Sequence, residues 1–199
     1  MKMVVIPHGA KVTGITQYPP ELASDPPMTM NGKAKMLELV PALKNLGPYK
    51  AVYCSLMDRA AGSMCTLAKQ LGIKRAVCID ELGQYSNKDD DGTSIRYPGH
   101  ETDNVITWQK QGLDAMRLIY QELFPGGESG GGALGGGTHV DHEIVVLVFT
   151  HRPILAGLIA TASYITDAEG IEGILAAKDL TGGKGFRVFN YDGRLTLEV

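Results

Sequence analysis

The sequence KMVVIPHG, at residues 2–9, begins with a short β-branched run that ends in a histidine and a glycine. Such a run, Lys2 to Ile6, is typical of a buried strand, and the His-Gly pair after it indicates a loop. The longest apolar strand is predicted over residues 143–150, and it is followed directly by His151. His8 and His151 therefore occupy the same kind of position, where a buried strand ends.

Strands and helices are predicted to alternate along the rest of the chain. Short apolar runs predict further strands at 51–54, 76–79, 186–190 and 195–199. Helical spacing predicts helices at about 30–46, 57–71, 101–124 and 153–164. Thr29 is a candidate N-cap of the first helix, which Pro41 must kink or split. This alternation predicts a three-layer α/β/α fold with a mainly parallel central sheet.

Length and composition favour one globular domain over residues 1–199. The chain is 44% hydrophobic and 21% charged, values that are ordinary for a globular protein. Irregular insertions are expected near 80–100 and 125–142. The second insertion is rich in glycine, which predicts a surface loop, and it lacks a phosphate-binding P-loop pattern.

Charge and hydropathy argue against two classes of partner. The formal net charge is -3 and no basic stripe occurs, so we expect no nucleic-acid partner. The most apolar stretch, 144–165, is interrupted by His151, Arg152 and Pro153, which a membrane span would not carry at its centre. We expect no membrane partner, and the sequence leaves a homodimer open.

Cysteine usage favours a reducing compartment. Cys54, Cys65 and Cys78 are odd in number, and their spacing matches no zinc pattern. We interpret them as reduced, mostly buried thiols of a cytoplasmic protein, without a signal peptide.

The two histidines are expected to face one crevice. Ligands of an open α/β sheet bind outside the carboxyl ends of its strands. Arg59 lies in the first turn of the helix that follows the strand at 51–54, and a helix start favours anions. Two imidazoles and a guanidinium suit phosphoryl transfer, in which a neutral imidazole is the nucleophile. Asp80 or Glu81, after the strand at 76–79, could supply the acid that protonates the leaving oxygen.

Five segments carry a further pattern. They are HG at 8–9, DPPMT with NGKA at 25–34, VYCS with RA at 52–60, PGHET at 98–102 and VFTH at 148–151. In this order they resemble motifs of the histidine phosphatase superfamily, the phosphoglycerate-mutase-like proteins. The resemblance covers most of the chain except residues 80–97 and 125–142.

The resemblance implies a role for each matched residue. His8 would be the nucleophile that forms a phosphohistidine, with Gly9 beside it in the phosphate site. Arg59 and His151 would bind the phosphoryl group. Glu81 would be the general acid, with Asp80 as the alternative. The resemblance implies no metal and no cofactor.

The sequence departs from the family pattern at two positions. Pro7 stands where the family has an arginine that binds phosphate, and Arg152 stands where glycine usually follows the second histidine. One hypothesis is that Arg152 restores the missing charge, and Lys11 is a weaker candidate for the same role.

Two functions of different classes follow from these residues. The first is a metal-independent phosphatase that hydrolyses a small phosphorylated molecule or a phosphoprotein through a phosphohistidine on His8. The second is a catalytically weakened or inactive relative that binds phosphate in a regulatory role, which Pro7 favours. A further alternative makes the glycine-rich loop a docking segment beside a vestigial pocket.

Overall fold

The structure, a computed structural model, describes residues 1–10, 27–83, 105–125, 144–176 and 185–198. In these ranges, six strands form one sheet in the order β3-β2-β4-β1-β5-β6. The strands are β1 (Lys2–Pro7), β2 (Tyr49–Cys54), β3 (Ala76–Cys78), β4 (Val145–Thr150), β5 (Arg187–Tyr191) and β6 (Leu195–Glu198). The first four are mutually parallel, whereas β5 is antiparallel to both β1 and β6. The predicted mainly parallel sheet is confirmed.

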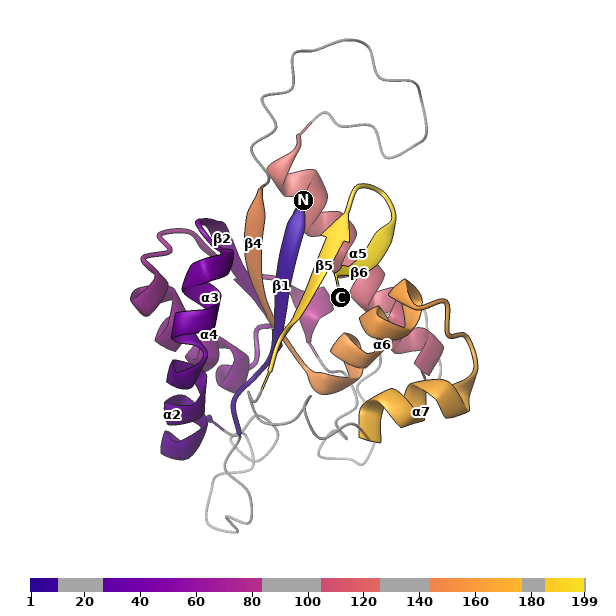
Figure 1. Cartoon of the computed structure of the whole chain (residues 1–199), viewed down its shortest axis with the longest axis horizontal. Helices are drawn as coiled ribbons and strands as arrows, with labels where there is room; N and C mark the ends of the chain where they lie inside the picture. The colour runs from indigo at the N-terminus through magenta and orange to yellow at the C-terminus, as the bar shows by residue number, and fades with distance from the viewer. Residues whose placement is uncertain (11–26, 84–104, 126–143, 177–184, 199) are drawn as a thin grey trace.

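Helices cover both faces of this sheet, as Figure 1 shows, with α2 to α4 on one side and α5 to α7 on the other. They are α2 (Met30–Glu38), α3 (Val40–Leu46), α4 (Asp58–Leu71), α5 (Val105–Leu123), α6 (Arg152–Ala162) and α7 (Ala168–Ala176). A short 3-10 turn, η1 (Asp80–Leu82), follows β3. The predicted three-layer α/β/α architecture is therefore confirmed. Among the described residues, no helix is both long and apolar enough to cross a membrane.

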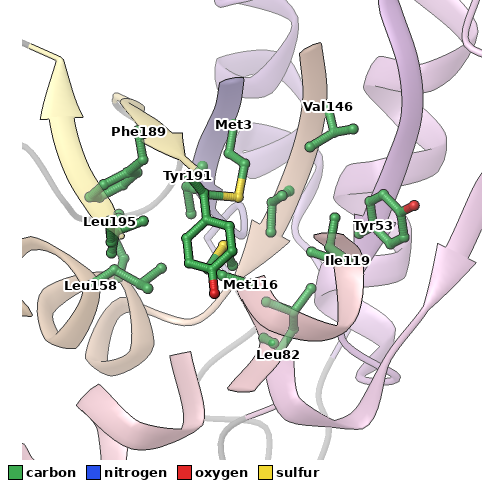
Figure 2. Packing of buried hydrophobic residues seen from close by; sticks show 14 of the residues in the cluster. Met3, Tyr53, Leu82, Met116, Ile119, Val146, Leu158, Phe189, Tyr191 and Leu195 are labelled. Atoms are coloured by element: carbon green, nitrogen blue, oxygen red, sulfur yellow. The ribbon is translucent and has the colours of Figure 1, made fainter. Parts of the chain in front are cut away.

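The core has one layer on each face of the sheet because side chains along a strand alternate between the faces. In β1, Val4 and Ile6 pack with α2, α3 and α4, whereas Met3 and Val5 pack with α5 and α6. All four side chains are fully buried. Figure 2 shows the second layer, where Met3 lies near Met116 of α5. Burial on both faces explains why the central strands read as continuous apolar runs.

Local sequence signals set several of the helix boundaries. The Thr29 side chain accepts a hydrogen bond from the Gly32 N–H (2.9 Å), so Thr29 is the predicted N-cap of α2. The predicted split around Pro41 is confirmed, since α2 ends at Glu38 and α3 begins at Val40. Gly72 ends α4 in a left-handed conformation (φ 68°), which glycine adopts without steric strain.

Other expectations are corrected or lie outside the described residues. Helix α7 was not predicted, because the two glycines in its sequence AEGIEGILA weaken the helical pattern, although Asp167 caps its first turn by accepting a hydrogen bond from the Gly170 N–H (2.7 Å). The strand after it begins at Arg187 rather than at residue 186, and the last strand ends at Glu198. The glycine-rich segment, and the expected insertion from residue 84 onward, lie outside the described residues.

Thr29 links the start of α2 to the segment that follows β1. Its hydroxyl donates to the Ala10 carbonyl (3.1 Å) while accepting from Gly32. We expect Thr29→Ala to lower the free energy of unfolding by about 1–2 kcal/mol, measured by urea denaturation, because the cap is lost. Thr29→Ser keeps the hydroxyl and should retain most of this stability. Equal losses in the two variants would contradict a capping role.

Candidate active site

Hydrogen bonds between strand ends bring the two predicted histidines together. β4 lies between β1 and β2, in parallel register with both. The ladder continues past the strands, since the His8 N–H donates to the Thr150 carbonyl (3.0 Å) and the Ser55 N–H donates to the Phe149 carbonyl (3.3 Å). The residues that follow three strands are therefore held side by side. The centroids of the His8 and His151 rings are 4.9 Å apart.

The hydrogen bonds of His8 define its tautomer. Nδ1 lies 2.7 Å from the Gly9 carbonyl oxygen, which can only accept, so Nδ1 carries the proton. Nε2 accepts a hydrogen bond from Nε of Arg59 at 3.2 Å. A neutral imidazole with its lone pair on Nε2 is thus turned toward the guanidinium. Such a nitrogen is a competent nucleophile.

His151 has the opposite tautomer. It is fully buried, and its Nδ1 lies 3.4 Å from Nη2 of Arg59, which can only donate. Nε2 therefore carries the proton and donates to the Ser55 hydroxyl oxygen at 2.9 Å. Ser55 is itself fully buried. The imidazole orientation is accordingly set by Arg59 on one nitrogen and by Ser55 on the other.

Arg59 joins the two imidazoles. It is the second residue of α4, so it lies within the first helical turn, and only 3% of its surface is exposed. One guanidinium group donates to both His8 and His151. Because the positive end of the helix dipole lies there as well, the site is suited to an anion with several oxygens.

Ser63, one turn further along α4, fixes the backbone beside His8. Its hydroxyl donates to the Arg59 carbonyl (2.7 Å) and accepts from the Gly9 N–H (3.0 Å). Gly9 also has no room for a side chain, because a Cβ there would overlap Met28. Gly9 thus contacts His8 through its carbonyl, while Ser63 holds its N–H.

The predicted acid lies on a segment anchored at the same edge of the sheet. The Thr150 hydroxyl donates to the Leu82 carbonyl (2.9 Å), and the Gln111 side-chain amide of α5 donates to the Gly83 carbonyl. Thr150 directly precedes His151, so η1 runs toward the end of β4. Within η1, Glu81 is half-buried and Asp80 is exposed.

Three residues of the sequence analysis remain, namely Pro7, Arg152 and Lys11. Pro7 is buried as the last residue of β1, opposite Thr150, and it cannot donate a hydrogen bond. Arg152 begins α6, and within the described part of the chain its buried Nε has no hydrogen-bond partner. Lys11 lies outside the described residues.

Four supporting residues were not identified as site residues from sequence. Ser55 belongs to the VYCS motif, so that motif could have indicated it. Ser63 lies four residues after Arg59, at the spacing that places both on one helix face. Thr150 belongs to the VFTH motif, whereas Gln111 carried no sequence signal, because its partner is a carbonyl group of a distant segment. Among the described residues, no group of three or more His, Cys, Asp or Glu could hold a metal ion.

Comparison with solved structures identifies the fold of this chain. The chain matches YhfR of Bacillus stearothermophilus over all of its own length and 94% of that chain (TM-score 0.63, 17% identity). It matches the mycobacterial glucosyl-3-phosphoglycerate phosphatase over 100% and 97% of the two chains (TM-score 0.63, 16% identity). The chain has the histidine phosphatase fold.

A third neighbour with the histidine phosphatase fold has a ligand. It is a mutant phosphoserine phosphatase from Entamoeba histolytica in complex with phosphoserine (TM-score 0.58, 16% identity, covering 100% of this chain and 95% of that chain). No protein-family model matches the sequence. No curated protein matches it significantly.

Ser63 offers a test of how the loop after β1 is held. We expect Ser63→Ala to lower the free energy of unfolding by about 1–3 kcal/mol in urea denaturation, because the buried Gly9 N–H loses its acceptor. Thr66→Ala is the matched control, since among the described residues the Thr66 hydroxyl donates within α4, to the Gly62 carbonyl. The control should change stability by less than about 0.5 kcal/mol. Similar effects of the two substitutions would refute the anchoring role.

Proposed function

We propose that this chain is a metal-independent phosphatase that hydrolyses a phosphomonoester through a phosphohistidine on His8. The substrate would be a small phosphorylated molecule or a phosphorylated protein side chain. The observation that carries this proposal is the guanidinium of Arg59, which donates to both the His8 and the His151 imidazoles. Three groups that can bind or attack a phosphoryl group thereby share one small site.

In the first step, a phosphoryl group would replace the imidazoles as acceptor of the Arg59 hydrogen bonds. Nε2 of His8 attacks phosphorus, forming an N–P bond as the P–O bond to the leaving group breaks. The Gly9 carbonyl, which accepts from Nδ1–H, stabilises the positive charge that then develops on the ring. Arg59 stabilises the charge on the equatorial oxygens, and His151 would do so in its doubly protonated form, in which Nδ1 also donates.

A carboxylic acid completes both halves of the reaction. Glu81 protonates the leaving oxygen, then accepts a proton from the water that attacks the phosphohistidine. Breaking the N–P bond releases inorganic phosphate and restores neutral His8. The contacts of Thr150 and Gln111 with the segment after Glu81 support this assignment, because Thr150 ties η1 to the end of β4 and Gln111 ties Gly83 to α5. Asp80 is the alternative acid.

The structural neighbours support the same class of chemistry. They include phosphatases, one of which was solved with phosphoserine, and the three neighbours described above share the fold at 16–17% identity. Since likeness at this level concerns the fold, the proposal for this chain depends on its own site residues.

A second candidate function is phosphate binding without turnover. Pro7 favours it, because a proline occupies the position where the family has a phosphate-binding arginine. Loss of one preorganised donor typically lowers the rate by about 100- to 1000-fold. A site that retains Arg59 and His151 would still bind an anion, as a regulatory module requires.

The test of the first function is phosphate release from a panel of phosphorylated compounds, with chelator present. We expect the wild type to release phosphate and His8→Ala to lose the activity, because no nucleophile remains. Arg59→Ala should lower kcat/KM by at least about 100-fold. Arg117→Ala is its matched control, since Arg117 is exposed and paired only to nearby Asp114 among the ion pairs of described residues, and it should leave the rate unchanged.

Inorganic phosphate separates the two functions. If the wild type releases no phosphate from any compound but is stabilised by inorganic phosphate in thermal unfolding, and Arg59→Ala abolishes that stabilisation, the binding function is supported. Absence of both turnover and phosphate-dependent stabilisation would refute both functions.

Arg152 can be tested as the replacement for the missing arginine. A buried guanidinium N–H without a partner is costly, and a phosphate oxygen would satisfy it. We therefore expect Arg152→Ala to lower kcat/KM about 100-fold and Arg152→Lys to recover part of it, in the same assay. Wild-type kinetics in Arg152→Ala would show that Pro7 is not compensated from this position.

A further inference from the structure

Two cysteines from adjacent strands lie side by side near the proposed site. Cys54 ends β2, Cys78 ends β3, and the two residues are paired in the parallel register. Their Sγ atoms are 3.3 Å apart. Sequence spacing alone gave no indication of this pair. The expectation of mostly buried thiols is wrong, since Cys65 and Cys78 are exposed and Cys54 is buried.

The backbone geometry is compatible with a disulfide. Residues paired on neighbouring strands lie about 4.8 Å apart, within the range of about 4.4–6.8 Å between Cα atoms that disulfides span. Forming the bond requires the sulfur atoms to approach by about 1.3 Å more, from 3.3 Å to about 2.04 Å. β3 is a three-residue strand at the edge of the sheet, so only one side of it is hydrogen-bonded to a neighbour.

The two thiols differ in their exposure to solvent. Cys78 is exposed, whereas Cys54 is fully buried in the core layer beneath α4. Burial, together with the contact with Cys78, raises the pKa of the Cys54 thiol. An oxidant from solvent would therefore meet Cys78 first, and Cys54 would be the resolving thiol.

We propose that Cys54 and Cys78 form a reversible disulfide on exposure to a peroxide. The Cys78 sulfur attacks the O–O bond, which yields a sulfenic acid and releases an alcohol, or water from hydrogen peroxide. The Cys54 sulfur then attacks the sulfenic acid, forming the S–S bond and releasing water. Two thiols are oxidised as one peroxide is reduced. A dithiol reductant reverses the reaction by exchange.

The disulfide would also change the site, an inference that rests on the proposed function. Ser55, which orients His151, directly follows Cys54. The N–H of Ile79 donates to the Cys54 carbonyl (2.9 Å), and the chain continues from Ile79 to the proposed acid Glu81. Moving the sulfur atoms together therefore shifts both segments, and a displacement of about 1 Å can lower an enzyme's rate about 100-fold.

Formation of the disulfide is tested by a measurement that does not depend on enzyme activity. The purified, reduced protein is treated with hydrogen peroxide, then alkylated, digested and analysed by mass spectrometry. We expect one alkylated cysteine, Cys65, and a cross-linked pair of peptides containing Cys54 and Cys78, which dithiothreitol separates. Cys78→Ser removes an exposed thiol and should abolish the cross-link, whereas Cys65→Ser, the matched control, should retain it. Cross-links that involve Cys65, or full alkylation of Cys54 and Cys78, would overturn the proposal.

The effect of the disulfide on the proposed active site is measured separately, by NMR and by phosphatase activity. We expect oxidation to shift the imidazole nitrogen signals of His151 in NMR spectra, and to lower phosphatase activity at least about tenfold. Dithiothreitol should restore both, and Cys78→Ser should respond to neither reagent. If the reduced protein has no activity, the proposed function fails while the His151 signals still report the coupling. A cross-link that leaves those signals unchanged would overturn the coupling to the site.

Discussion

The position of β4 between β1 and β2 determines the arrangement of the whole site. Parallel hydrogen bonding on both sides of β4 places the ends of three strands in one row. His8, Ser55 and His151 are the residues that follow those strands. The backbones of His8 and Ser55 are held by the same ladder that holds the core, and His151 directly follows β4, so the site acquires the rigidity of the sheet.

Arg59 adds the charge that this row of residues lacks. Its place in the first turn of α4 follows from the loop between β2 and that helix, and Ser63 then ties α4 back to Gly9. The tautomers of the two imidazoles differ because Arg59 donates to Nε2 of His8 but to Nδ1 of His151, which leaves the proton on Nδ1 of His8 and on Nε2 of His151. In the proposed function, Nε2 of His8 is the nucleophile and the His151 ring binds the phosphoryl group.

The same edge of the sheet connects the site to the cysteine pair. β2 ends in Cys54 and continues into Ser55, while β3 ends in Cys78 and continues into η1. Any change at the paired thiols is therefore one residue from Ser55 and three residues from Glu81. Chemistry at the sulfur atoms and chemistry at phosphorus would share the same short backbone segments.

The sequence by itself determined the layers of the fold and the principal candidate site residues. Apolar runs, caps and breakers act over a few residues, so strands, the break near Pro41 and the positions of His8, Arg59 and His151 could be read from local pattern. Tertiary structure alone decided the hydrogen-bond partners of Ser63, Thr150 and Gln111, the tautomers and the approach of Cys54 to Cys78. These contacts depend on strand order and register, which bring together residues 24 to 96 positions apart in the chain. Local sequence patterns extend over only a few residues, so they cannot predict contacts between residues this far apart in sequence.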